Sequence, residues 1–198
     1  MSAPRESYKK MEVLLMKGWM IAVAVVVLVV IMGISGYNSL VQMNENVNGK
    51  WAQVENQLQR RGDLIPNLVS TVKGYAAHEQ QAIQAVADAR AKLGGAQGPA
   101  AKAQADAEFG GALSRLLVIA ENYPNLKADQ NFRALMDELA GTENRIGVAR
   151  RDYNDAVQGY NAKIQSFPAV IYARMLGFGS KEYFKAAEGA KEVPKVQF

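Results

Sequence analysis

Side chains that commonly carry out catalysis are scarce in this chain of 198 residues. It contains one His, His78, and no Cys, which excludes disulfides, thiol nucleophiles and zinc–thiolate sites. A catalytic zinc usually takes two or three His ligands, and a di-iron bundle needs paired Glu-x-x-His motifs. This chain has neither set of ligands. The serines after residue 36 lie in no recognisable catalytic motif: Ser39, Ser70, Ser114, Ser166 and Ser180. We therefore predict a protein that is not an enzyme and has no catalytic, cofactor-binding or metal site.

Three other patterns of polar or flexible residues have structural interpretations. The pair His78-Glu79 predicts a hydrogen-bonded pair or a surface position, and a pH sensor is the alternative because His titrates near neutrality. The run Gly94–Pro99 follows a helical pattern rather than a strand, which indicates a flexible connector and not a phosphate-binding loop. Asn154 and Asn161 are seven residues apart, each directly after a Tyr. Such asparagines either set the register or oligomeric state of a coiled coil, or form caps and surface hydrogen bonds.

The elements that hold these residues include an uncharged, almost wholly apolar run of 17 residues from Gly18 to Ile34. As a helix it is about 25 Å long, close to the thickness of the hydrocarbon core of a bilayer. The run exceeds the apolar region of a secretory signal, and no clear cleavage site follows it, so we expect an uncleaved membrane anchor. We divide the chain into a basic tail (1–17), a transmembrane helix (18–36), a helical bundle (37–180) and a C-terminal tail (181–198).

Basic residues flank the apolar run unequally. Arg5, Lys9, Lys10 and Lys17 precede it, whereas Lys50 is the one basic residue within about 20 residues after it. The positive-inside rule therefore predicts a single-pass protein with a cytoplasmic N-terminus and an extracytoplasmic bundle. The net charge is +4, but basic and acidic residues are interspersed and no basic stripe carries interleaved aromatic residues. We expect no nucleic-acid partner.

The rest of the chain has the residue pattern of long amphipathic helices. We predict an all-α fold, in which the transmembrane helix is followed by an antiparallel, up-and-down bundle. A first seam carries Val47, Trp51, Val54 and Leu58, and a third helix from about Ala101 to Asn122 carries Phe109, Leu113, Leu116 and Ala120. The most regular helix is capped by Asp129 and stopped by Pro168. Its seam keeps heptad spacing throughout: Phe132, Leu135, Leu139, Thr142, Ile146, Ala149, Tyr153, Ala156, Tyr160, Lys163 and Phe167.

The segment Arg60–Pro66 leaves two interpretations open. Gly62 as a helix stop, Asp63 as an N-cap and Pro66 in the first turn predict a hairpin between two helices. Against this, the heptad phase continues across the segment to Ile65, which indicates one kinked helix. We favour the hairpin because it divides the chain into legs of more even length.

The segment 167–178 is unusually apolar. We expect it to pack over the open end of the bundle, because proteins keep few exposed apolar patches, and contact with the membrane surface is the alternative. The tail that follows it, which ends in Val196-Gln197-Phe198, is expected to be loosely held or extended.

A series of short runs between about Tyr37 and the C-terminus forms a specific pattern. These runs are Arg60–Val69, Val72–Ala76, His78-Glu79, Ala120–Pro124, Leu126–Ala128, Thr142–Ile146, Ala149-Arg150, Tyr153-Asn154, Tyr160-Asn161 and Phe167-Pro168. In composition and order they resemble the LemA family of bacterial membrane proteins. The resemblance implies an N-terminal transmembrane helix and a helical bundle, and we expect this helix to lie in the inner membrane. It implies no catalytic residues, because the molecular function of the family is not established.

These observations support two hypotheses of function. The first is a non-enzymatic, membrane-anchored helical scaffold that self-associates into a homo-oligomer at the cell membrane, where the lipid bilayer is its other partner. The alternative is a membrane-tethered adaptor or sensor that binds an unidentified protein partner through the bundle. The anchor, the long heptad seams and the missing catalytic chemistry are compatible with both.

Overall fold

The computed structural model describes residues 3–76 and 78–185, and side chains from residue 16 onward. The predicted all-α fold is confirmed, because all regular secondary structure in these ranges is helical. The helices are α1 (Ala3–Asp63), α2 (Ile65–Tyr75), α3 (Gln80–Gly95), α4 (Gly98–Ala120), α5 (Pro124–Ala128), α6 (Gln130–Gln165) and α7 (Ala169–Met175).

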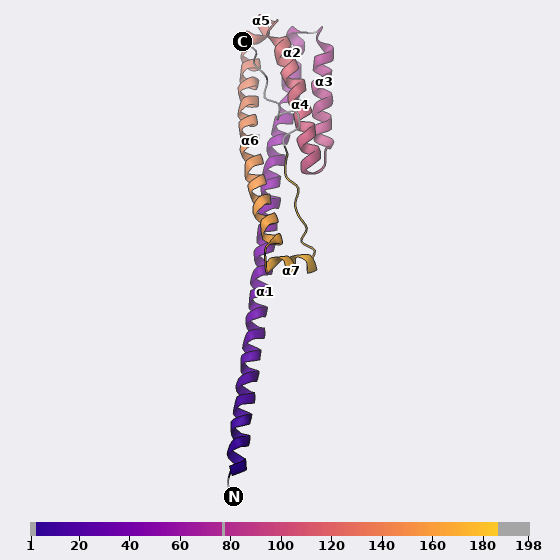
Figure 1. The fold of residues 1–198 in the computed structure, drawn as a ribbon. Coiled ribbons are helices and arrows are strands. Elements are labelled where there is room, and N and C mark those ends of the chain that lie inside the picture. The colour runs from indigo at the N-terminus through magenta and orange to yellow at the C-terminus, as the bar shows by residue number, and fades with distance from the viewer. Residues whose placement is uncertain (1–2, 77, 186–198) are drawn as a thin grey trace, which may run out of the picture.

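The described helices form a long, narrow rod (Figure 1). Helix α1 runs through most of its length, and α6 packs along the second half of α1. The two helices are antiparallel, because Lys50 pairs with Asp152 whereas Arg60 pairs with Glu138. Helices α2 to α5 thicken the distal end, where α3 and α4 form a hairpin, and α7 lies across the rod near the middle of α1.

The predicted hairpin at residues 60–66 is wrong. Leu64, between α1 and α2, keeps right-handed helical backbone angles (φ −75°, ψ −22°), so α2 continues the path of α1. Gly62 therefore stays inside the helix, at a propensity cost of about 1 kcal/mol that the buried seam on either side outweighs. Leu58, Ile65 and Leu68 are all buried. The chain turns instead between Tyr75 and Gln80, about four helical turns later.

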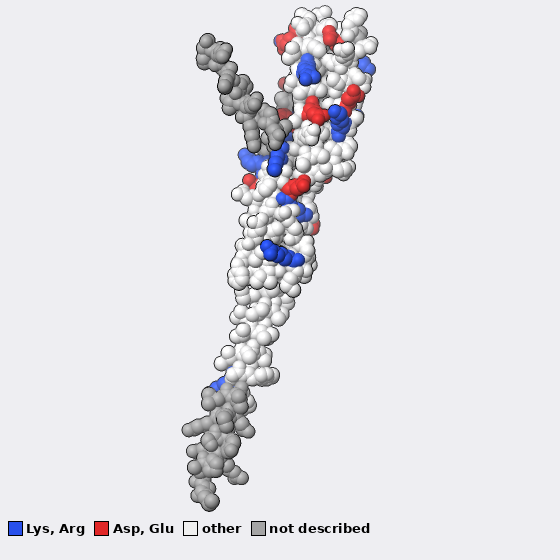
Figure 2. Space-filling model, turned by 45° about the vertical axis from the view of Figure 1, so that its right-hand side comes forward, with Lys and Arg blue, Asp and Glu red and all other residues white. Residues whose placement is uncertain are grey.

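Residues 16–32 of α1 are exposed, with no other described part of the chain packed around them. Among the described residues, α1 is the one helix that is long and apolar enough to cross a membrane. The most apolar 18-residue window of α1 is 0% buried. Side chains such as Trp19, Val26 and Ile31 are therefore exposed. Figure 2 shows a band without charged side chains along this part of the rod, below the bundle. A core helix of a soluble protein would be buried on at least one face.

The core follows the predicted seams, with a gradual drift along α6. The seam is buried as expected at Phe132, Leu139 and Ile146, but further along Val157 and Ile164 are buried where the heptad pattern predicted Ala156 and Lys163. A straight α-helix has 3.6 residues per turn, so a strict heptad seam rotates by about 20° per repeat relative to its partner. The last seam position, Phe167, is 82% exposed.

The predicted helix ends are mostly confirmed. Asp129 caps α6, because its Oδ1 atom accepts a hydrogen bond from the backbone N–H of Phe132 at 2.9 Å. The glycine-rich connector is present as the short link between α3 and α4, where Gly98 has a positive φ of 77°.

In the apolar segment 167–178, Ala169 and Ala173 are buried as predicted, but Met175 is 80% exposed. The segment therefore packs on the bundle with one face only.

The first residues of the C-terminal tail are extended and firmly held. Residues 181–185 have no helical structure and run beside α6, and Phe184 is buried in the core. The predicted end of the tail, Val196-Gln197-Phe198, lies outside the described residues.

Candidate functional site

A buried cluster of charged side chains joins α1, α4 and α6. Asp106 of α4 is 4% exposed, and its Oδ1 atom accepts a hydrogen bond from Nη1 of Arg61 of α1 at 3.1 Å. Its other oxygen, Oδ2, pairs with Nη2 of Arg150 of α6. At the rim, Oε2 of Glu143 lies 2.6 Å from Nη1 of Arg61. Two guanidinium groups and two carboxylates therefore balance their charges in the middle of the bundle.

Burial dominates the electrostatics of this cluster. It lowers the pKa of Arg61, while the charge of Glu143 acts in the opposite direction. Burial also lowers the pKa of Arg150, and the nearby charge of Arg61 adds to this effect. Arginine nevertheless stays protonated in proteins, so the cluster moves no proton at neutral pH. Its chemistry is that of a structural ion network, which fixes the register of three helices.

Aromatic rings cover both guanidinium groups. The Arg61 guanidinium lies 5.0 Å from the centroid of the Phe109 ring, and that of Arg150 lies 4.7 Å from the centroid of Phe184. Such cation–π contacts stabilise a desolvated cation. They matter here because the Nε atoms of both arginines are buried without a hydrogen-bond partner among the described residues.

The ring of Phe184 connects the ion cluster to a second polar feature on α6. This feature, the asparagine clasp, consists of Asn154 and Asn161. The side chain of Asn161 donates to the carbonyl of Lys181 at 2.9 Å and accepts from its N–H at 2.8 Å. Asn154 makes the same pair of bonds with Phe184, at 3.0 and 2.9 Å. Each carboxamide thus satisfies one backbone donor and one acceptor, as a neighbouring β-strand would.

Simple geometry explains the spacing of the clasp. Seven residues of helix cover about 10.5 Å, and the three residue steps from Lys181 to Phe184 cover about 10 Å of extended chain. The two asparagines therefore bind the two ends of the same extended segment. The segment runs antiparallel to α6, because the later asparagine holds the earlier backbone position.

Two aromatic side chains, one on α1 and one on α6, complete this attachment. The hydroxyl of Tyr153 donates to the carbonyl of Glu182 at 2.7 Å, and burial raises the pKa of this hydroxyl. The ring of Trp51 lies 5.2 Å from that of Tyr153 and 6.3 Å from that of Phe184, measured between centroids. The extended segment is therefore part of the core and not a loose tail.

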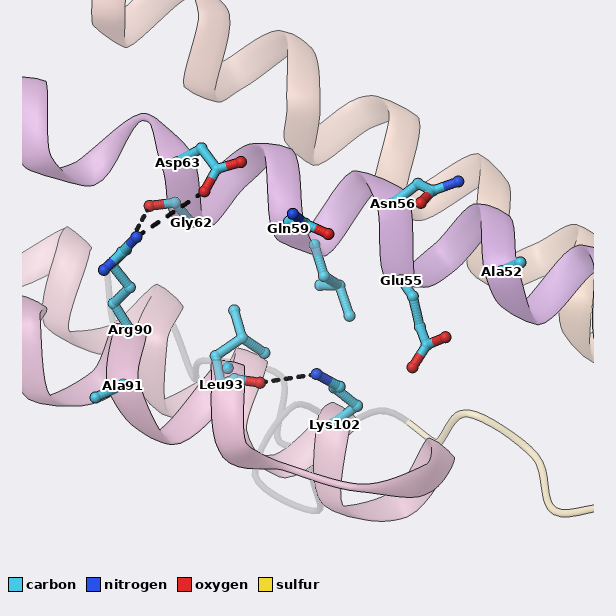
Figure 3. A pocket seen from close by; sticks show the side chains of 12 residues that line it. Ala52, Glu55, Asn56, Gln59, Gly62, Asp63, Arg90, Ala91, Leu93 and Lys102 are labelled. Atoms are coloured by element: carbon cyan, nitrogen blue, oxygen red, sulfur yellow. Dashed lines mark hydrogen bonds and ion pairs between the residues drawn. The ribbon is translucent and has the colours of Figure 1, made fainter.

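A groove of about 510 Å³ opens between α1 and the α3–α4 hairpin (Figure 3). Its two strongest donors are used by the protein itself. Arg90 Nε donates to the carbonyl of Gly62 at 2.7 Å, and Lys102 Nζ donates to the carbonyl of Leu93 at 3.0 Å. Glu55 points into the opening. The groove has mixed charge and brings together no acid–base or nucleophile–base pair.

The residues that the sequence suggested for chemistry do not converge. His78 is exposed, as the surface alternative predicted, and Glu79 accepts a hydrogen bond from the hydroxyl of Tyr123 at 3.0 Å. Ser114 and Ser166 donate to carbonyls in their own turns, of Gly110 and Lys163. No group of three or more metal-ligating side chains occurs within the described part of the chain.

Sequence reasoning singled out the asparagine clasp but missed the ion cluster. The spacing of Asn154 and Asn161 was visible, although it pointed to coiled-coil register or caps rather than to a hold on the tail. For the cluster, a signal existed in Arg61, a charged residue at a seam position between Leu58 and Ile65. Asp106 lies three residues before the buried Phe109, on the same face of α4.

One family model and several known proteins match this chain. The model of the LemA family matches residues 50–198. Magnetosome protein MamQ 2 of Paramagnetospirillum magneticum is 31% identical over 175 residues, which are 75% of this chain and 64% of the relative. MamQ of Magnetospirillum gryphiswaldense is 32% identical over 174 residues, with the same coverage. Protein LemA of Metamycoplasma hominis is 24% identical over 156 residues, covering 76% of this chain and 69% of the relative. The chain thus spans 64% of the length of these MamQ proteins.

Proposed function

The chain belongs to the LemA family, and on this premise we propose that it is a non-enzymatic scaffold, anchored in the membrane by α1, that self-associates into a homo-oligomer. One observation carries the proposal. A single helix continues from the apolar span at residue 18 to Asp63 in the bundle, without a loop at the membrane boundary. A helix of this kind holds the bundle at a set height and direction, which favours ordered contacts between neighbouring copies.

The polar groups of the bundle support a structural role. The buried charges of Arg61, Asp106 and Arg150 bind one another, and the clasp asparagines bind the backbone of the tail. These groups bind within the protein itself and so stabilise the rod. The names of the MamQ relatives tie them to the magnetosome and not to a reaction, which also favours a scaffold.

The proposed contact between copies uses the face formed by α1 and α6. A shallow hollow of about 380 Å³ lies there, lined by Gln53, Gln57, Asn144, Arg145, Val148, Ala149 and Asp152. Val148 is 49% exposed at this hollow. A second copy that covers Val148 removes its apolar area from water, which favours association.

The native mass of the full chain in lipid nanodiscs tests self-association. We expect a discrete oligomer, and a strict monomer at near-native density in the membrane contradicts the proposal. Val148→Glu places a charge in the proposed contact and should shift the distribution toward monomer. Val118→Glu is the matched control, because Val118 is also exposed (69%) but lies on α4, away from this face.

The proposed orientation has the N-terminus in the cytoplasm and the bundle in the periplasm, with α1 in the inner membrane. The excess of basic residues before the span supports it. Because the chain has no Cys, single-cysteine variants report topology cleanly. An impermeant maleimide added to intact spheroplasts should label Ser114→Cys and should label Ser7→Cys only after lysis. The reverse pattern contradicts the orientation.

The alternative is an adaptor that binds a different protein through the groove between α1 and the α3–α4 hairpin. Its mixed charge and its size favour a polar segment of a partner. Crosslinking from Glu55→Cys in intact cells separates the two functions. One dominant heterologous product supports the adaptor, whereas products with other copies of this chain support the scaffold.

A further inference from the structure

Helix α7 presents an apolar face that no part of the described chain covers. Ala169 and Ala173, one turn apart, are each 1% exposed and face the bundle. On the opposite side Ile171 is 54% exposed and Met175 is 80% exposed, and the preceding Phe167 is 82% exposed. Soluble surfaces rarely keep large apolar side chains together in this way.

The contacts of α7 with α1 fix its height along the rod. A Cβ atom on Gly36 would overlap the Tyr172 hydroxyl, so α7 lies directly against α1 at this residue. The rings of Tyr37 and Phe178 meet edge to face, with their centroids 5.9 Å apart. Gly36 is only two residues, or about 3 Å, beyond the apolar run that ends at Ile34. The interfacial layer on each side of a bilayer is about 5–7 Å thick. The contact with Gly36 therefore places α7 within this layer.

The chain path sets which side of α7 is free. Helix α6 reaches α7 from the bundle, and the chain after α7 returns toward the bundle to enter the asparagine clasp (Figure 1). The side away from the bundle is therefore the open one. Arg174 is exposed beside the apolar residues, where its long side chain can extend to lipid phosphates.

We propose that α7, together with Phe167 and Leu176, lies in the membrane interface on the bundle side and binds the lipid surface of the bilayer that α1 crosses. The occupant of the apolar face is lipid at the boundary of headgroups and acyl chains, as for other amphipathic interfacial helices. The inference rests on the span of α1 and is independent of the scaffold function. It gives the rod a second membrane attachment, which limits its tilt.

Site-directed spin labelling of the full chain in phosphatidylcholine–phosphatidylglycerol nanodiscs tests this proposal. Single labels at Met175→Cys and Phe167→Cys are compared with a label at Val118→Cys. All three side chains are more than two-thirds exposed (80%, 82% and 69%), so none of these substitutions disturbs the core. Accessibility to oxygen, which concentrates in lipid, is measured against accessibility to a nickel chelate, which stays in water.

We expect an oxygen-to-nickel ratio at least about twofold higher at positions 167 and 175 than at 118, as for residues at the headgroup boundary. Equal ratios at the three positions overturn the proposal, because they place α7 in water. Low accessibility to both reagents at 167 and 175 also overturns it, since protein from a second copy then covers the face. Equal ratios leave the native-mass result unchanged, whereas a face covered by a second copy is accompanied by an oligomeric native mass, so failure of this proposal is distinguishable from failure of the scaffold proposal.

Discussion

The two halves of α1 bury their apolar side chains in different surroundings. From Met16 to Ile34 the side chains are exposed all around the helix. From Leu40 to Asp63 the same helix buries one stripe, including Leu40, Val47 and Val54, against α6 and its neighbours. The first half is apolar on every side and the second on one side, which is the difference between a helix in lipid and a helix in a bundle.

This difference separates what stabilises each half. Transfer of apolar area into lipid stabilises the span, and polar groups there are strongly unfavourable. In the bundle, packing and paired polar groups stabilise the fold, and even the buried charges of Asp106 and its partners are tolerated because they are paired. Substitutions should therefore affect one half and leave the other intact.

The largest expected effect is in the bundle, from Asp106→Ala. It leaves the guanidinium groups of Arg61 and Arg150 buried without their shared carboxylate, which costs about 3–5 kcal/mol of unfolding free energy. Thermal unfolding in detergent, followed by circular dichroism, should show this loss, while the chain still inserts into membranes. Asp137→Asn, on the exposed face of α6, is the control, and an equal effect of both substitutions would contradict the role of the cluster.

In the span, Val26→Lys places a charge near the middle of the apolar run. A lysine at the centre of a transmembrane helix is unfavourable by about 2.5–3.5 kcal/mol. Carbonate extraction should recover less of this variant with the membrane, although the bundle still unfolds at its normal temperature. A variant that inserts normally would show that the first half of α1 is not in the hydrocarbon core.

A smaller and local effect is expected from Asn161→Ala. It removes two hydrogen bonds to the backbone of Lys181, worth about 2 kcal/mol together. Hydrogen–deuterium exchange should become faster in residues 181–184, and α1 should keep its protection. Asn38→Ala, at an exposed position of α1, serves as the comparison. Unchanged exchange in the tail would contradict a holding role of Asn161, because the bonds of Asn154 and Tyr153 and the packing of Phe184 would then suffice.

The smallest effect is expected from the cap of α6 and depends on pH. The backbone N–H of Phe132, and then the hydroxyl of Tyr75, hold the pKa of Asp129 below its ordinary value of 3.8. A lowered pKa in the folded state means that Asp129 stabilises the bundle above the unfolded-state pKa. This contribution is lost as pH falls through the lower folded-state pKa. Asp129→Asn should remove this part of the acid sensitivity in unfolding curves, and an unchanged acid limb would contradict the assignment.

Periodicity predicted the parts of the fold that depend on repeated apolar residues. The seams with Val54, Phe109 and Ile146 are buried as expected. A heptad pattern identifies the buried face of a helix even when the element that packs against it is unknown. The turn was misplaced because Gly62 and Asp63 carry strong local stop signals, whereas the turn after Tyr75 contains no Pro and depends on how α3 packs. Tertiary packing overrode local propensity in both places.

The candidate site was less predictable because its members are far apart in the chain. Arg61 and Asp106 are 45 residues apart, and Asn154 and Phe184 are 30 apart. Spacing within one helix reveals which residues share a face, and so the asparagines were noticed. It does not reveal which distant backbone or charge will meet that face, and the cluster required the three-dimensional arrangement of α1, α4 and α6.

The continuity of α1 across the membrane boundary is the central claim, and one distance measurement tests it most directly. Spin labels at Val25→Cys and Gln53→Cys, one in each half of α1, are 28 residues apart in the sequence. In nanodiscs diluted with unlabelled chain, double electron–electron resonance should give one narrow distance distribution near about 42 Å, the length of an unbroken helix. A broad distribution, or one centred at a much shorter distance, would contradict a stiff helix that joins the span to the bundle.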